Sequence, residues 1–159
     1  MVSNPLPRVA RRLAARRWVM RIAPVVLRLE RVVRRVSGGK RGILDLAGLP
    51  SIEITVPGRK TGLPRSTSLL YVPDGANFLV LGSNWGSAKH PVWSANLRAA
   101  AAATVRTKSE QLEVTVNEVT GVDRKRVWDL AVEFWPGYEM ECELSGGREF
   151  RIFELRRRA

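Results

Sequence analysis

The sequence predicts a small barrel of short antiparallel β-strands with helices at its edges, preceded by a basic amphipathic helix. Strand-like runs separated by glycine and proline turns follow one another from about residue 50 to the end. Two stretches with helical spacing interrupt these strands, and almost all of the net charge lies in the first 41 residues. The length of 159 residues fits one domain with a sizeable core.

Residues 8–36 are expected to form the amphipathic helix, with a kink at Pro24. Apolar side chains recur there every three or four residues, and arginine occupies most other faces. The apolar positions are Val9, Leu13, Val19, Ile22, Val26, Leu29, Val33 and Val36.

The segment 1–41 contains twelve basic residues and one acidic residue, Glu30, so it carries +11 of the chain's net charge of +12. After its arginine pairs, the longest uncharged run is residues 22–27, which is shorter than the roughly 7–15 apolar residues of an export signal or the ~20 of a membrane span. We therefore expect residues 8–36 either to cover the barrel or to lie on an anionic membrane surface. We expect no nucleic-acid partner, because basic and aromatic residues do not interleave.

Residues 37–42 predict a flexible linker, which leaves residues 43–159 as the compact domain. A helix should begin at Pro91 and run to about Ala101. A second helix should open with a capping box at Thr120 and end at Trp135, with a loop after it. Strands are expected over residues 51–56, 66–72, 77–83, 104–108, 111–119 and 150–155.

The usual catalytic groupings are absent from this sequence. One histidine and one cysteine, Cys142, cannot form a metal cluster or a disulfide, so we expect no metal site and a reducing cytoplasmic location. Nucleophile elbows, phosphate-binding P-loops and dinucleotide-binding motifs are also missing. A bound cofactor is therefore expected to supply the chemistry, and the protein to bind and orient it.

The first candidate binding segment is Gly58–Arg65, with the sequence GRKTGLPR. Its two glycines permit a tight turn that presents backbone N–H groups, and three cations lie within the same eight residues. Arginine pairs with phosphate through its fork of donors, and lysine acts as a point charge. This segment alone fits an anion cradle or an ordinary hairpin with exposed charges.

The second candidate segment runs from Leu81 to Leu97. A strand there ends in small polar residues, a glycine-containing loop follows, and a helix begins at Pro91. Trp93 on the first turn of that helix fits the wall of a ring-binding pocket, although a core position explains it equally well.

In order and separation, the two segments resemble the deazaflavin (coenzyme F420)-dependent nitroreductases and quinone reductases. The resemblance is good over residues ~50–120 and implies a split β-barrel like that of the pyridoxamine-phosphate oxidases and the FMN-binding flavin reductases. The matching positions are Gly58–Arg65, Tyr71, Asp74, Gly75, Ser83, Gly86, Pro91, Trp93, Asn96 and Leu97.

The resemblance also implies a set of site residues. Ser83 and Tyr138 are the candidate groups that would polarise an electron acceptor. The sequence departs from the family pattern on the acceptor side, with Trp85 where many members have a second glycine and Trp135, Tyr138 and Glu141 where the nitroimidazole-activating members have several tyrosines, and the acceptor would contact these four residues. The coenzyme would be held by Arg59, Lys60, Thr61, Arg65, Thr67, Ser68, Leu70, Leu81, Gly82, Ser83, Asn84, Val92, Trp93 and Asn96.

The expected activity is hydride transfer from reduced coenzyme F420 to a quinone, a nitroaromatic or another unsaturated small molecule. Two alternatives stay open: an FMN-dependent reductase of the same fold, and a non-catalytic protein that binds a membrane surface or an anion through its basic leader. The expected location is cytoplasmic, and peripheral on the inner face of the cell membrane if residues 8–36 bind lipid. The sequence leaves the oligomeric state open, and related barrels point to a homodimer.

Overall fold

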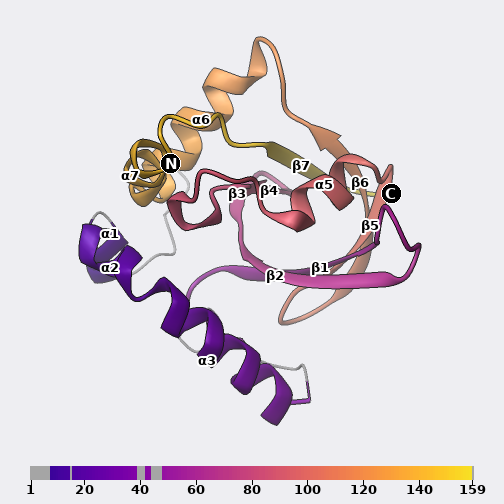
Figure 1. Ribbon diagram of the computed structural model, residues 1–159. Helices are drawn as coiled ribbons and strands as arrows, with labels where there is room; N and C mark the ends of the chain where they lie inside the picture. The colour runs from indigo at the N-terminus through magenta and orange to yellow at the C-terminus, as the bar shows by residue number, and fades with distance from the viewer. Residues whose placement is uncertain (1–7, 15, 39–41, 44–47, 159) are drawn as a thin grey trace.

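The core of the molecule is one antiparallel sheet of seven strands in the order β2-β1-β5-β6-β7-β4-β3 (Figure 1). The structure, a computed structural model, describes residues 8–14, 16–38, 42–43 and 48–158. The strands are β1 (Ser51–Pro57), β2 (Pro64–Leu70), β3 (Val72–Asp74), β4 (Asn77–Leu81), β5 (Ala102–Arg106), β6 (Gln111–Glu118) and β7 (Ile152–Arg157).

A short connection curls this sheet into a barrel. Strands β2 and β3 are its two opposite edges, yet only Tyr71 separates them in the chain. One residue spans no more than ~3.6 Å of extended chain, so the two edges must come close together in space. The sheet therefore curls round on itself with β2 and β3 at the seam, and the predicted split β-barrel is confirmed.

The strands bury side chains as their alternation predicts. Ile52, Ile54 and Val56 of β1 are buried, and the residues between them are half-buried. In β4, Leu79 packs into a first hydrophobic cluster, which also contains Val127, Phe134 and Phe150. Val80 packs into a second cluster, which also contains Ile52, Val105 and Phe153, so this strand is covered on both faces. The expected strand over residues 66–72 is instead β2 and β3, which are interrupted at Tyr71.

Helix α6 (Asp123–Phe134) packs on β3, whereas the shorter α5 (Val92–Arg98) packs on β1 and β6 (Figure 1). Helix α6 buries Val127, Ala131 and Phe134 against the first cluster, as its spacing predicts. Helix α5 follows Pro91, which is its N-cap residue.

Two helix predictions are wrong. No side chain caps α6, whose N-cap is Val122, so the capping box expected at Thr120 does not form. The loop expected after Trp135 is instead α7 (Gly137–Leu144). Pro136 and Gly137 look like a helix stop in the sequence, but here Pro136 is the N-cap of the next helix, where its missing N–H costs nothing.

The basic leader forms three helical segments, α1 (Arg8–Ala14), α2 (Arg17–Arg21) and α3 (Ala23–Val36). The break before α3 lies at Ile22, so Pro24 stands at a helix start and does not bend a continuous helix. Arg17 forms an ion pair with Glu143 of α7 at 3.7 Å. Residues 15 and 39–41, the latter in the predicted linker, lie outside the described residues.

An apolar stripe on this leader faces away from the barrel. Its members recur every three or four residues and are Trp18, Ile22, Val25, Leu29, Val32 and Val36, all exposed. Val26 and Val33, each one position after a stripe residue and so about a quarter-turn round the helix, are half-buried. Figure 1 shows α1 to α3 as an arm along the outside of the barrel. None of the described helices is long and apolar enough to cross a bilayer.

Gly86 tests the packing of the η1 turn (Asn84–Gly86) against α7. Its φ is +74°, and an added Cβ would lie 2.9 Å from Leu144 Cβ and 3.1 Å from the carbonyl oxygen of Glu141. Gly75 has a similar φ of +61° with open space around it, so Gly75→Ala is the matched control. We expect Gly86→Ala to lower the free energy of unfolding by about 1–3 kcal/mol more than Gly75→Ala does, as measured by urea denaturation. Equal losses would contradict this packing.

Candidate active site

A pocket of about 950 Å³ opens between the β1–β2 hairpin and the segment that runs from η1 into α5. Its floor is apolar and formed by the second core cluster, through Ile54, Val56 and Leu97. Trp93 forms part of the wall, with its ring centroid 6.2 Å from that of Phe153. A volume of this size suits a cofactor or a drug-sized molecule.

The cation-bearing turn is held in shape by its two glycines. Gly62 has a φ of +70°, which favours glycine. A Cβ on Gly58 would meet Thr61 Oγ1 at 3.0 Å and the Leu63 carbonyl oxygen at 3.3 Å, so a larger residue would force these neighbours to shift. The backbone N–H of Gly58 donates to the Leu63 carbonyl at 2.8 Å, which closes the loop.

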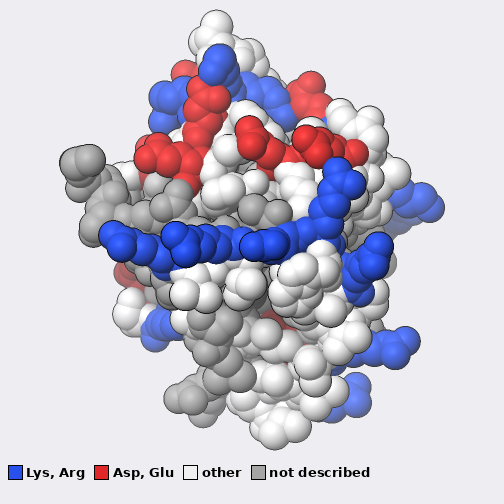
Figure 2. All heavy atoms as spheres, turned by 90° about the vertical axis from the view of Figure 1, so that its left-hand side faces the viewer, with Lys and Arg blue, Asp and Glu red and all other residues white. Residues whose placement is uncertain are grey.

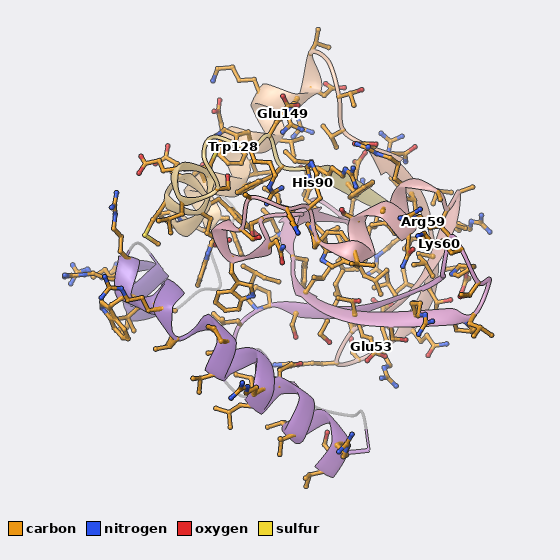
Figure 3. The ribbon with its side chains drawn as sticks, viewed as in Figure 1. Glu53, Arg59, Lys60, His90, Trp128 and Glu149 are labelled. Carbon is orange, nitrogen blue, oxygen red and sulfur yellow. The ribbon has the colours of Figure 1, made fainter. Side chains whose placement is uncertain are left out.

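One hydrogen bond joins the two candidate segments. The backbone N–H of Arg59 donates to Asn96 Oδ1 on α5 at 3.2 Å, and Asn96 is 8% exposed. Figure 3 shows Arg59 and Lys60 together at the β1–β2 turn, and His90 on the segment that leads to α5. Two motifs that are far apart in the sequence therefore line one pocket, as the resemblance implied.

Four cations line the pocket: Arg59, Lys60, Arg65 and Lys89. Within the part of the chain that the structure describes, none of the four forms an ion pair, and no Asp or Glu is among the lining residues. The arginines elsewhere on the barrel are commonly paired, as Arg98 is with Glu118 and Arg106 with Glu53. Unpaired cations around a concave surface attract a polyanion.

Most of the predicted coenzyme contacts lie in this pocket. They are Arg59, Lys60, Thr61, Arg65, Thr67, Asn84, Val92, Trp93 and Asn96. Ser68 and Leu70 are not among the lining residues. Successive side chains of a strand point to opposite faces, so Thr67 and Leu69 face the pocket while Leu70 packs against the other core cluster. Leu81, Gly82 and Ser83 are not among the lining residues, and Leu81 packs into the first cluster.

The predicted acceptor contacts gather elsewhere, around α7. Tyr138 is 4% exposed within the first core cluster, and burial raises the pKa of its hydroxyl. Trp135 packs against the same cluster. Neither these residues nor Trp85 and Glu141 line the pocket. These expected acceptor contacts therefore lie outside the pocket, and Tyr138 does not reach the pocket surface.

A buried carboxyl group links α7 to the end of β4. Glu141 is 5% exposed, and the Ser83 hydroxyl and the Trp135 side chain hydrogen-bond to it. Burial raises its pKa to about 7, although those two hydrogen bonds and the charge of Arg148 act in the opposite direction. At neutral pH this carboxyl is therefore protonated in a substantial fraction of molecules.

The resemblance missed several residues that form the pocket wall. Lys89, His90 and Ser87 lie in the segment before α5, beside Asn84. The Asn84 side-chain amide donates to the Lys89 carbonyl at 2.9 Å, and Asn84 and Trp85 both have positive φ. The only sequence signal for these residues was a lysine next to a histidine at the end of a glycine-containing loop, and this pattern alone does not indicate a binding site.

The residues present fit a large anionic cofactor with one flat ring. The cations are unpaired, and the apolar floor beside Trp93 suits a ring. The expected cradle of backbone N–H groups does not form, because those of Gly58, Arg59, Thr61, Gly62 and Leu63 all donate within the protein, so the cationic side chains would hold the anion. The described residues contain no cluster of side chains that could hold a metal ion.

Comparison with known proteins identifies the family. The sequence profile of the F420H2-dependent quinone reductase family matches residues 26–151. The chain belongs to this family. It is 32% identical over 120 residues to a Mycobacterium tuberculosis protein named F420H2-dependent quinone reductase, covering 74% of this chain and 80% of that protein.

Solved structures agree with this assignment. An F420-H2 dependent reductase superimposes with a TM-score of 0.61 and 29% identity, covering 67% of this chain and 93% of that chain. A second structure, described as a domain-swapped dimer, has the same TM-score and identity and covers 67% of this chain and 79% of the other.

The raised pKa of Glu141 predicts how stability depends on pH. In the unfolded chain this carboxyl loses its proton near its ordinary pKa of 4.5, whereas the folded chain keeps it up to about 7. The native state therefore binds more protons in this window, and stability falls as the pH rises from about 4.5 to 7. Glu141→Gln removes the effect, so we expect this variant to gain roughly 3 kcal/mol relative to the wild type between pH 4.5 and 8.

Urea denaturation at several pH values measures this difference. Glu139→Gln, on the exposed side of the same helix, is the control and should follow the wild-type pH profile. Parallel profiles for Glu141→Gln and the wild type would show that Glu141 ionises normally.

Proposed function

We propose that this protein transfers a hydride from reduced coenzyme F420 to a quinone. Family membership supports the coenzyme and the class of acceptor. The observation that carries the proposal is the lining of the pocket, where four unpaired cations surround an apolar floor and one backbone hydrogen bond ties its two walls together.

The chain's own residues would bind and orient. Arg59, Lys60 and Arg65 on the hairpin would neutralise the acidic tail of the coenzyme, with Lys89 on the facing wall. Ile54, Val56 and Trp93 would pack against the ring and exclude water, which strengthens every electrostatic contact at the site. When bound, the reduced deazaflavin supplies the hydride, so no protein nucleophile is required.

A quinone gains negative charge as it accepts a hydride, and the protein has to stabilise that charge. Ser83 is our proposed donor on the acceptor side, because it lies between β4 and η1, directly before Asn84 of the pocket lining. Its hydroxyl is hydrogen-bonded to the Glu141 carboxyl, which holds a proton near neutral pH. Tyr138, the other expected donor, is a less suitable candidate, because its side chain is enclosed in the core.

Purified protein tests the activity directly. Oxidation of reduced F420, followed by its absorbance, should depend on both the protein and menadione. A protein that is yellow as purified, and that reduces menadione with FMN but not with F420, would favour the FMN alternative.

Arg59 and Lys60 on the β1–β2 turn are expected to contribute much of the affinity for F420. We expect Arg59→Ala/Lys60→Ala to raise the dissociation constant of F420 about 100-fold or more, since each charged hydrogen bond contributes about 1.5–3 kcal/mol. A fluorescence titration of the coenzyme measures it. Lys108→Ala removes an exposed cation of the β5–β6 turn and should bind like the wild type. Equal affinity in all three proteins would remove the binding assignment.

We also infer that the leader holds the protein on an anionic membrane surface. Its exposed apolar stripe has no partner among the described residues of the barrel that would cover it. Arg21, Arg28 and Arg35 are exposed at seven-residue intervals, so they form a row beside that stripe. Figure 2 views the side that α1 and α2 occupy, and Lys and Arg form a row across it with acidic side chains above.

This pattern of an apolar stripe beside basic rows is typical of helices that lie in the membrane interface. Each basic residue near an anionic surface contributes about 1 kcal/mol, and the apolar side chains add the hydrophobic part. A second copy of the leader is a poorer partner for the stripe, because two segments of net charge +11 repel each other.

Vesicle sedimentation tests the leader. We expect Val25→Glu/Leu29→Glu to reduce binding to vesicles containing phosphatidylserine at least tenfold, because two charges would enter the apolar interface. Val122→Glu is the control, since Val122 is 95% exposed at the start of α6, outside the stripe. Unchanged vesicle binding, with both variants keeping their F420 affinity, would exclude a role for the stripe.

We propose a homodimer as the state in solution. The solved relative described as a domain-swapped dimer supports it. Light scattering on the full chain gives the mass, and a monomer across the micromolar range would contradict it.

A further inference from the structure

Arg148, in the connection between α7 and β7, reaches across to the pocket wall that precedes α5. Its Nε donates to the Ser87 carbonyl at 3.1 Å, its Nη1 to the Gly82 carbonyl at 3.0 Å and its Nη2 to the Ser83 carbonyl at 2.8 Å. The guanidinium also lies 4.7 Å from the centre of the Phe150 ring. One side chain therefore holds both ends of the strained turn that contains Asn84 and Trp85.

The same guanidinium contacts the only histidine of the chain. Arg148 Nη1 lies 3.0 Å from His90 Nδ1. A guanidinium can only donate hydrogen bonds and stays protonated at any physiological pH. Nδ1 must therefore accept with its lone pair, because a proton on it would set two N–H groups against each other. The imidazole is then uncharged, and its proton is on Nε2.

The other ring nitrogen of His90, Nε2, is the one available to the pocket. His90 is a pocket-lining residue and Arg148 is not. The ring edge that bonds to Arg148 therefore faces the protein, and Nε2 lies toward the opposite edge. Among the described residues, no hydrogen bond is made by Nε2.

The charges that surround His90 favour the same form. Burial lowers the pKa of the imidazole. Three positive charges lower it further: those of Arg151, which directly precedes β7, of Arg148, and of Arg98 in α5. Glu118 of β6 acts in the opposite direction, but it is paired with Arg98. Lys89, the neighbour in the chain, adds another positive charge to this wall.

We propose that Arg148 is a positioning residue that fixes His90 with its ring proton on Nε2, and that this N–H donates a hydrogen bond to an oxygen atom of the molecule bound in the pocket. The inference rests on the proposed function only for the identity of that molecule, which is the coenzyme or its quinone acceptor. Carbonyl and phosphate oxygens both have a lone pair that can accept this hydrogen bond. The four cations attract the bound molecule by charge, whereas a neutral N–H of fixed direction would also orient it.

Nitrogen NMR of the free protein tests the first part. Because the chain has one histidine, its two ring nitrogens need no assignment to a residue. At pH 7.5 we expect Nδ1 to appear unprotonated and Nε2 protonated. In Arg148→Met and Arg148→Lys the Nδ1 constraint is lost, so the ring should become a mixture of tautomers. Arg126→Met removes an exposed arginine that pairs with Asp74, and it should keep the wild-type spectrum.

Variants of His90 test the second part. His90→Phe keeps a flat ring without a donor, and His90→Gln keeps an N–H at comparable reach. We expect His90→Phe to raise either the F420 dissociation constant or the KM for menadione about 3- to 10-fold, and His90→Gln to return that constant most of the way to the wild-type value. A rise in the F420 dissociation constant assigns the oxygen to the coenzyme, and a rise in KM for menadione alone assigns it to the acceptor.

Three outcomes would overturn the proposal. An Nδ1–H tautomer or an imidazolium in the free wild type would remove the Arg148 constraint. Wild-type binding and kinetics in His90→Phe would remove the donor role. If the wild type binds no F420 at all, the proposed function fails; NMR of the free protein still decides the Arg148 contact, and the donor role fails with the function. If the Arg148 variants do not fold, the wild-type spectrum and the His90 variants decide.

Discussion

The arrangement of this protein depends on the single residue, Tyr71, that connects the two edges of its sheet. A flat sheet would separate β2 from β3 by the width of five strands, and no single residue could bridge that distance. Curling brings the β1–β2 hairpin opposite the chain that leaves β4. The pocket forms there, and the hydrogen bond from Arg59 to Asn96 fixes the distance between its walls.

The sequence was sufficient for the strands and the fold because their signals are local. Ile52, Ile54 and Val56 alternate with polar residues, and the structure buries them as that pattern predicts. The errors arise where a residue type has two uses. Pro136 both ends and begins helices, so α7 was missed, and Pro24 starts a helix that the apolar spacing had drawn as continuous.

Within the site, the first motif contains three of the cations that line the pocket, while Ser68 and Leu70, also expected to contact the coenzyme, do not line it. Thr67 lines the pocket and Ser68 does not, and the alternation of side chains along a strand accounts for the difference. Arg148 carried no signal in the sequence. Its importance comes from carbonyl groups of Gly82 and Ser83, more than sixty residues away, and only the fold shows that they meet.

The gathering of Arg59, Lys60, Arg65 and Lys89 has a consequence for the empty protein. Like charges that share a concave surface repel one another, so the folded chain carries electrostatic strain until an anion relieves it. A ligand that binds only the folded state then raises its stability by mass action. The lifetime of this protein in a cell would follow the supply of its coenzyme, and synthesis of one would set the abundance of the other.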